Sequence, residues 1–260
     1  MLELKIQNMI EVFVLSIIQG VTEFLPISSS SHIILTSKFL NFTNENLLMD
    51  VSLHIGSFIA VLFFFHIEIL NFFKYKKLFI LIILSSLPVI ILGYFISKSG
   101  IINDLRTVKT IGWTTLLFGI LLYFSDKQKN VKNLEKNFDT KSAIIIGFLH
   151  AISLIPGVSR SGIAITAARF LNFERVDAAK ISFLLSIPTL FAVGVYGMYN
   201  VYQFENLYIA KLNFLSIFLS FVFSYLTMKL FLDFVKKSNL LIFVVYRIFL
   251  GIILLFYAYQ

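Results

Sequence analysis

Long apolar runs alternate with short polar stretches along the whole chain, and their lengths predict helices that cross a membrane. Six runs of 17 to 25 residues are long enough to span hydrocarbon about 30 Å thick. These runs cover residues 47–67, 78–96, 108–124, 178–199, 207–231 and 240–259. Pro88 predicts a kink in the second run. The pattern therefore predicts an all-α integral membrane protein with six transmembrane helices.

Two further apolar regions are each interrupted by a polar stretch that contains proline. Residues 10–25 and 33–42 form the first region, around QGVTEFLPISSSSH at 19–32, and residues 143–155 and 163–170 form the second, around PGVSRSG at 156–162. The second arm of each region is too short to cross a bilayer. A serine-rich surface turn would also account for the first stretch. Because irregular backbone at membrane depth must line a protein-enclosed cavity, we expect two re-entrant helical hairpins with polar tips.

The two regions also predict an internal repeat. A shift of 130 residues aligns five polar or proline positions: Pro26 with Pro156, Ser29 with Ser159, Ser31 with Ser161, Thr36 with Thr166, and Ser52 with Ser182. Three spans separate the hairpins, and this odd number makes them enter from opposite faces. We expect one polytopic domain over residues 1–260, with inverted-topology repeats at about 1–124 and 142–260. A basic cytoplasmic loop at 125–141 joins them.

The composition supports a membrane protein. Of 260 residues, 58% are hydrophobic and 14% are charged, against about 25% charged residues in soluble domains. The mean hydropathy is +0.88. The absence of cysteine excludes disulfides and thiolate metal sites. The N-terminal residues MLELKIQNM contain no small-residue cleavage site, so we expect no removable signal peptide.

The net charge of +8 would suggest nucleic acid as the partner of a soluble protein, but here the basic residues lie in loops. The predicted topology puts fourteen of them on one face and six on the other, with Arg160 and Arg247 inside the membrane. The positive-inside rule makes the richer face cytoplasmic and puts both termini outside. We expect contact with membrane lipids and no binding of nucleic acid.

Arg160 is the strongest candidate for recognising an anion. A charge in hydrocarbon costs on the order of 3 kcal/mol or more, and the guanidinium fork suits a phosphate or carboxylate. Helix amides that start near it would point at the same anion. Its predicted companions in substrate binding are Ser28, Ser30, Ser31, Gly157, Ser159, Ser161 and Gly162. In the simpler interpretation Arg160 only neutralises Glu23, but such a pair is a poor stabiliser and leaves the hydroxyls unexplained.

The first polar stretch contains candidates for metal binding and catalysis. Gln19 and Glu23 share one helix face, and their oxygens suit a divalent cation such as Mg²⁺ or Ca²⁺ that the substrate would help to hold. His32 lies three residues after Ser29 and would act as a general base or acid near neutral pH. Packing is the simpler role for a single histidine, and we assign that role to His54.

The motifs EFLPISSSSH and PGVSRSG resemble the undecaprenyl-diphosphatase family of bacteria, also called the bacitracin-resistance family. The resemblance extends over the chain, through HIGSFIAV and ISFLLSIP. It implies dephosphorylation of undecaprenyl diphosphate to the lipid carrier of cell-wall synthesis, at a site open to the outer face of the cytoplasmic membrane, with a divalent cation. The family's acidic, serine, histidine and arginine positions fall on Gln19, Glu23, Ser29, His32 and Arg160.

The sequence departs from the family pattern at two positions. Gln19 takes the amide option, which weakens a two-carboxylate metal site, and Ser31 stands where glycine or alanine is expected. A lipid-phosphate transporter or flippase would use the same anion site. The grouping of Ser29, His32 and Glu23 favours hydrolysis, because a carrier needs no proton-transfer group.

The sequence alone leaves several points open. They are whether Ser29 is a nucleophile or a ligand, which metal is used, whether the lipid is also flipped, whether the protein forms a homodimer, and what His54, His150 and Arg247 do.

Overall fold

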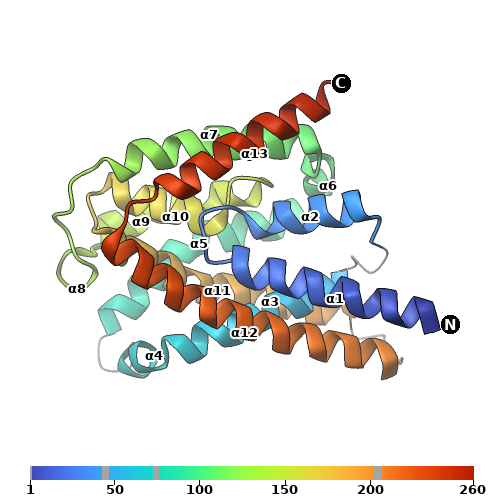
Figure 1. Cartoon of the computed structure of the whole chain (residues 1–260). Coiled ribbons are helices and arrows are strands. Elements are labelled where there is room, and N and C mark those ends of the chain that lie inside the picture. The colour runs from blue at the N-terminus through green and yellow to red at the C-terminus, as the bar shows by residue number, and fades with distance from the viewer. Residues whose placement is uncertain (1, 43–46, 73–75, 202–206) are drawn as a thin grey trace.

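The computed structural model is a bundle of helices and describes residues 2–42, 47–72, 76–201 and 207–260 (Figure 1). The helices are α1 (Leu2–Thr22), α2 (Ser29–Leu40), α3 (Leu47–Phe64), α4 (His66–Phe72), α5 (Lys76–Ser99), α6 (Ile101–Leu105), α7 (Val108–Asp126), α8 (Leu134–Asn137), α9 (Thr140–Ala151), the 3₁₀ turn η1 (Ile152–Leu154), α10 (Arg160–Phe170), α11 (Arg175–Val201), α12 (Leu207–Lys237) and α13 (Leu241–Ala258). In these residues the β structure is one isolated bridge, between Lys132 and Phe173.

Five of the described helices are long and apolar enough to cross a membrane. The candidate segments are Lys76–Ser99, Val108–Asp126, Arg175–Gly197, Ala210–Lys237 and Leu241–Ala258. Helix α3, in the first predicted span, is a shorter apolar helix. The prediction of an all-α, multi-pass membrane protein is therefore confirmed at this level.

The first interruption separates α1 from α2. Helix α1 ends at Thr22 because Pro26 lacks the N–H that would bond the Thr22 carbonyl, and because the residue before a proline avoids helical dihedrals. Two boundaries differ from the prediction: α1 starts at Leu2 instead of residue 10, and α2 starts at Ser29 instead of residue 33. The polar residues at both ends continue each helix past its apolar part.

The second interruption separates α9 from α10. Asp139 caps α9 by accepting a hydrogen bond from the Ser142 N–H at 2.8 Å, and this bond holds the pKa of Asp139 below its ordinary value. Helix α9 ends at Ala151, and η1 leads to Pro156. Ser159 then caps α10 by accepting from the Gly162 N–H at 3.0 Å. Both interruptions thus lie where the prolines predict them.

The backbone corrects the predicted spacing between the two interruptions. Ser28 and Ser159 precede α2 and α10 with φ angles of 74° and 73°. Asn41 and Asn172 follow the same helices with φ angles of 52° and 67°. Both pairs are 131 residues apart, and so are two copies of FLNF, at 39–42 and 170–173. The prediction of 130 is therefore one residue short, because the second interruption is one residue longer between its proline and its helix.

Small residues let helices from the two halves of the chain approach closely. Helices α1 and α3 both pack on α12. A Cβ at Gly20 would lie 2.4 Å from Cβ of Phe223, and one at Gly56 would lie 2.3 Å from the Ile217 carbonyl oxygen. Glycine at these positions is what permits the contact, as in other membrane helix pairs.

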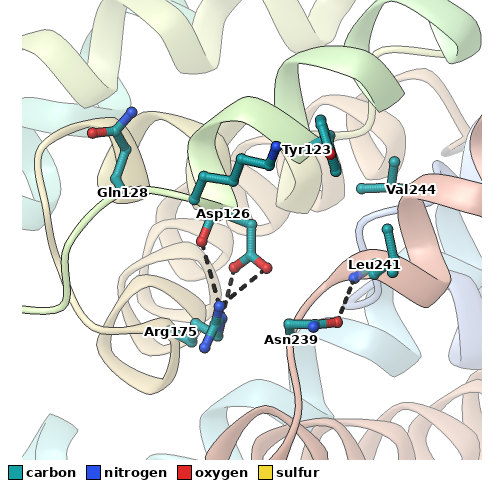
Figure 2. Close-up of a pocket in the computed structure, with 8 residues that line it drawn as sticks. Tyr123, Asp126, Gln128, Arg175, Asn239, Leu241 and Val244 are labelled. Atoms are coloured by element: carbon teal, nitrogen blue, oxygen red, sulfur yellow. Dashed lines mark hydrogen bonds and ion pairs between the residues drawn. The ribbon is translucent and has the colours of Figure 1, made fainter.

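The chain termini lie at one end of the bundle and α8 lies at the other (Figure 1). At the α8 end, Asp126 accepts hydrogen bonds from Nε and Nη2 of Arg175 at 2.7 and 3.2 Å and from the Leu240 N–H at 3.0 Å. Figure 2 shows the Arg175 side chain directed at this carboxylate. Arg169 is fully buried, with Nε 3.8 Å from Asp126 Oδ1. One carboxylate therefore joins the C-terminal ends of α7 and α10 to the starts of α11 and α13.

We predict that Asp126→Ala lowers the free energy of unfolding by about 3–5 kcal/mol, because it leaves the buried Arg169 guanidinium without its carboxylate. Thermal unfolding in detergent micelles measures the change. Asp233→Ala is the matched control, because Asp233 forms an exposed ion pair with Lys236, and it should change stability far less. Equal losses in the two variants would contradict the structural role of Asp126.

Candidate active site

A cavity of about 440 Å³ lies where the two interruptions meet. The residues on its wall that come from the interruptions are Glu23, Ser28, Ser29, Ser30, Pro156, Ser159 and Arg160. Tyr94 and Ser97, near the end of α5, and Arg106, just after α6, also line it. Because α6 lies at the end of the bundle where the termini lie (Figure 1), the cavity extends toward that end. A second pocket, of about 280 Å³, surrounds Asp126 and Arg175 at the opposite end (Figure 2).

The Glu23 carboxylate is the centre of the polar groups in the larger cavity. Its Oε2 accepts a hydrogen bond from the Ser29 hydroxyl at 2.5 Å and another from the Gln19 amide at 3.0 Å. Its Oε1 forms an ion pair with Nη2 of Arg160. The two interruptions thus bring Glu23, Ser29 and Arg160 together. A serine hydroxyl that donates to a carboxylate is in position to lose its proton to that carboxylate.

Arg160 joins the second interruption to the first. It is the first residue of α10, directly after the cap Ser159. Its Nη1 donates to Oγ1 of Thr189 on α11 at 3.1 Å while Nη2 contacts Glu23. Two partners fix the plane of the guanidinium at the cavity wall, which is the orientation that bidentate recognition of a phosphate requires.

Gln19 lies behind Glu23. Its side chain is fully buried and is not part of the cavity wall. Its amide nitrogen donates to Glu23 and to the Ser57 hydroxyl, the latter at 3.3 Å, and its Oε1 has no partner among the described residues. Because an ionised carboxylate only accepts hydrogen bonds, the nitrogen must face Glu23. This geometry orients Glu23, and the metal-binding role of Gln19 stays a prediction.

His32 is turned away from the groups that meet at Glu23. Its Nδ1 lies 2.6 Å from the Ser28 carbonyl oxygen, and its Nε2 lies 2.5 Å from the Tyr246 hydroxyl. The two rings stack, with centroids 5.7 Å apart. The partner of Ser29 is therefore Glu23 and not His32, and a catalytic role of His32 stays a prediction.

The other predicted substrate-binding residues divide into two groups. Ser28, Ser30 and Ser159 line the cavity. Ser31 is buried against the Ser28 hydroxyl at 3.0 Å, and Ser161 donates to the Leu25 carbonyl at 2.6 Å.

The two glycines are required by packing. Gly157 has φ of +93°, and a Cβ there would lie 1.9 Å from Oγ1 of Thr114. A Cβ at Gly162 would lie 2.9 Å from Nη1 of Arg247. Neither glycine is on the cavity wall, so their contribution is to let the second interruption and the start of α10 pack closely against α7 and Arg247.

Several residues near the site were not predicted from the sequence. Asp50 and His54 line the cavity, with His54 Nδ1 3.4 Å from Oδ1 of Asp50, whereas His54 was predicted to pack. Their spacing of four residues on one helix was the available signal. No sequence pattern marked Thr189 or Tyr246 as a residue of the site, because a single hydroxyl in an apolar helix is common.

Comparison with known proteins identifies the family of this chain. Residues 12–253 match the family model described as "Bacitracin resistance protein BacA". A protein of Pelagibacter ubique (strain HTCC1062) named "Undecaprenyl-diphosphatase" is 46% identical over 97% of this chain and 99% of its own length. Proteins of the same name from Jannaschia sp. (strain CCS1) and Chromohalobacter salexigens are 36% and 40% identical, over 97% and 95% of this chain and 99% and 97% of their own lengths. The chain therefore belongs to the BacA bacitracin resistance protein family.

Proposed function

We propose that this protein is a membrane phosphatase that hydrolyses undecaprenyl diphosphate to undecaprenyl phosphate and inorganic phosphate. The observation that carries the proposal is the meeting of Ser29, Glu23 and Arg160 on one cavity wall. The names of the relatives support the substrate. Recycling of the lipid carrier of cell-wall synthesis and resistance to bacitracin follow from this activity and fit the family description.

In the proposed reaction Arg160 binds the phosphate oxygens, and Ser29 attacks the terminal phosphorus. The Ser29 Oγ–P bond forms, the proton of Oγ passes to Glu23, and the bond from phosphorus to the bridging oxygen breaks. Its electron pair leaves with undecaprenyl phosphate. Glu23 passes that proton to the departing undecaprenyl phosphate and is a carboxylate again. Water then attacks the phosphoserine and gives a proton to Glu23, the bond from phosphorus to Oγ breaks, and Oγ takes that proton. Inorganic phosphate is released and the Ser29 hydroxyl is restored. Arg160 and the amides that begin α10 stabilise the charge on the transferring group.

The residues present fit a divalent cation only as a companion of the substrate. Mg²⁺ and Ca²⁺ bind six or more oxygens, and the described residues contain no group of three or more His, Cys, Asp or Glu side chains that could hold a metal. We propose that Mg²⁺ or Ca²⁺ enters with the diphosphate, whose oxygens supply most ligands. Glu23 would be its carboxylate ligand, and the cation would neutralise phosphate charge.

Two alternatives use the same groups. In the first, Glu23 activates a water molecule directly and Ser29 is only a ligand. In the second, the protein is a lipid-phosphate transporter or flippase. The 2.5 Å hydrogen bond between Ser29 and Glu23 favours hydrolysis, because a carrier has no use for it. Phosphate release by purified protein in detergent separates hydrolysis from transport.

We also propose the membrane arrangement. Helices α3, α5, α7, α11, α12 and α13 are the six spans, and α1–α2 and α9–α10 are the re-entrant hairpins of an inverted repeat. With 12 and 11 residues, α2 and α10 are about 18 Å and about 16 Å long, well short of the bilayer core. The lysine-rich loop 125–141 faces the cytoplasm of the bacterium, so the cavity and both termini face outward.

We predict that Ser29→Ala and Glu23→Gln each lower turnover at least about a hundredfold, because the nucleophile and its base act as one unit. Phosphate release from undecaprenyl diphosphate measures the loss. Tyr246→Phe removes only the hydroxyl that contacts His32, so its turnover measures the contribution of His32 separately from that of Ser29 and Glu23. A Ser29→Ala variant with more than about a third of normal turnover would exclude the covalent route and leave attack by water.

The topology has its own test, because the chain has no cysteine. We expect Gln260→Cys to react with a membrane-impermeant maleimide in spheroplasts, and Lys129→Cys to react only after lysis. Both positions are exposed in the structure, so accessibility to the reagent is matched. The reverse pattern would overturn the proposed orientation.

A further inference from the structure

Arg247 is a buried arginine in the middle of α13. It is only 1% exposed and is among the largest fully buried side chains. Within the described ranges it forms no ion pair with a carboxylate, and its hydrogen bonds go to backbone carbonyl groups. It does not line the catalytic cavity. A cation at this depth is costly and marks a functional position.

The carbonyls that Arg247 binds belong to both interruptions. Nη1 donates to the Pro26 carbonyl at 2.9 Å. Nη2 donates to the carbonyls of Gly157 and Val158 at 2.9 and 3.0 Å. These groups lie where the helical hydrogen-bond pattern is broken, so they take donors from elsewhere in the protein. One guanidinium supplies donors to both interruptions.

The bonded carbonyls lie next to the strained backbone that carries the reacting groups. Val158 directly precedes Ser159, and Pro26 lies two residues before Ser28; both serines have φ near 74°. The residue after each strained serine is Ser29 or Arg160. Non-glycine residues keep such dihedrals only where surrounding contacts hold them.

Two glycines make room for this arginine. A Cβ at Gly162 would lie 2.9 Å from Nη1, and a Cβ at Gly119 on α7 would lie 2.9 Å from Cβ of Arg247. Nε also donates to the Thr115 carbonyl on the same helix at 3.3 Å. The final glycine of PGVSRSG thus leaves room for the Arg247 guanidinium and for the Ser159 side chain.

We infer that Arg247 is a positioning residue for the proposed phosphatase reaction. Its hydrogen bonds to the carbonyls of Pro26, Gly157 and Val158, which we call the clasp, hold the two interruptions together. Ser29 and Arg160 therefore meet at Glu23, and Arg247 itself touches no substrate. The inference rests on the proposed function, because its readout is phosphate release. Since Arg247 aligns the reacting groups and touches no substrate, its loss lowers kcat far more than it changes KM.

The test compares variants of two buried arginines in purified, detergent-solubilised protein with undecaprenyl diphosphate as substrate. We expect Arg247→Lys and Arg247→Met to lower kcat at least about thirtyfold, with KM within about threefold of wild type. Arg169→Lys is the control, because Arg169 also donates to backbone carbonyls, those of Phe173, Asp126 and Gln128, but at the far end of the bundle. Arg169→Lys should keep the kcat of wild type even where its thermal unfolding midpoint falls as far as the midpoints of the Arg247 variants.

A second pair of variants covers the case in which Arg247 variants do not fold. Gly119→Ala displaces Arg247 while keeping its charge and should also lower kcat. Gly194→Ala is the control, because its new Cβ would meet only Cγ1 of Ile55 at 3.8 Å. In Arg247→Ala, millimolar guanidinium chloride should restore turnover that equal sodium chloride does not.

The outcomes separate the two proposals. Folded Arg247→Met and Gly119→Ala variants with kcat within about threefold of wild type would overturn the clasp and leave the phosphatase intact. Equal kcat losses in Arg247→Lys and Arg169→Lys would also overturn it, because the effect would then be general destabilisation. A wild-type protein that releases no phosphate would instead overturn the proposed function.

Discussion

A helix that is interrupted leaves backbone groups without partners, and this protein satisfies some of these groups with donors from the other interruption and from α13. The Ser161 hydroxyl, just past the second interruption, donates to the Leu25 carbonyl in the first at 2.6 Å. Arg247 donates to Pro26 and to Gly157. The Leu25 carbonyl of the first interruption thus has its donor in α10, and Arg247 bonds to both interruptions, so the contact between the two interruptions is part of how the chain folds.

The site chemistry follows from that meeting. Glu23 comes from the first interruption and Arg160 from the second, and the two interruptions bring opposite charges into contact at the cavity wall. A buried ion pair is a weak stabiliser by itself, which points to a use beyond folding. In the proposed reaction Arg160 binds the phosphate oxygens, and Glu23 serves as base for Ser29. Ground-state contacts and catalytic contacts thus use the same atoms.

Much of the fold was predictable because membrane constraints act on long segments. Apolar runs marked the helices, and Pro26 and Pro156 marked the interruptions. The spacing of 131 was missed because a gap-free comparison cannot detect one extra residue between Pro156 and Ser159, although the two FLNF copies were visible.

The candidate site was predictable only in part. Glu23, Ser29 and Arg160 were found because charges and hydroxyls are rare in hydrocarbon. The orientation of the His32 side chain was not predictable, because the rotation of α2 depends on the φ angle of Ser28 and on the distant Tyr246. The partners of Arg247 are backbone carbonyls, which every residue possesses, so no side-chain pattern pointed to them.

The most direct test of this account is a double-mutant cycle on turnover with Glu23→Gln and Arg160→Lys, measured as phosphate release from undecaprenyl diphosphate. If the two side chains act as one unit across the interruptions, the double variant should lie within about threefold of the slower single variant. Losses that multiply would show that Glu23 and Arg160 act independently, and would contradict the claim that their contact organises the site.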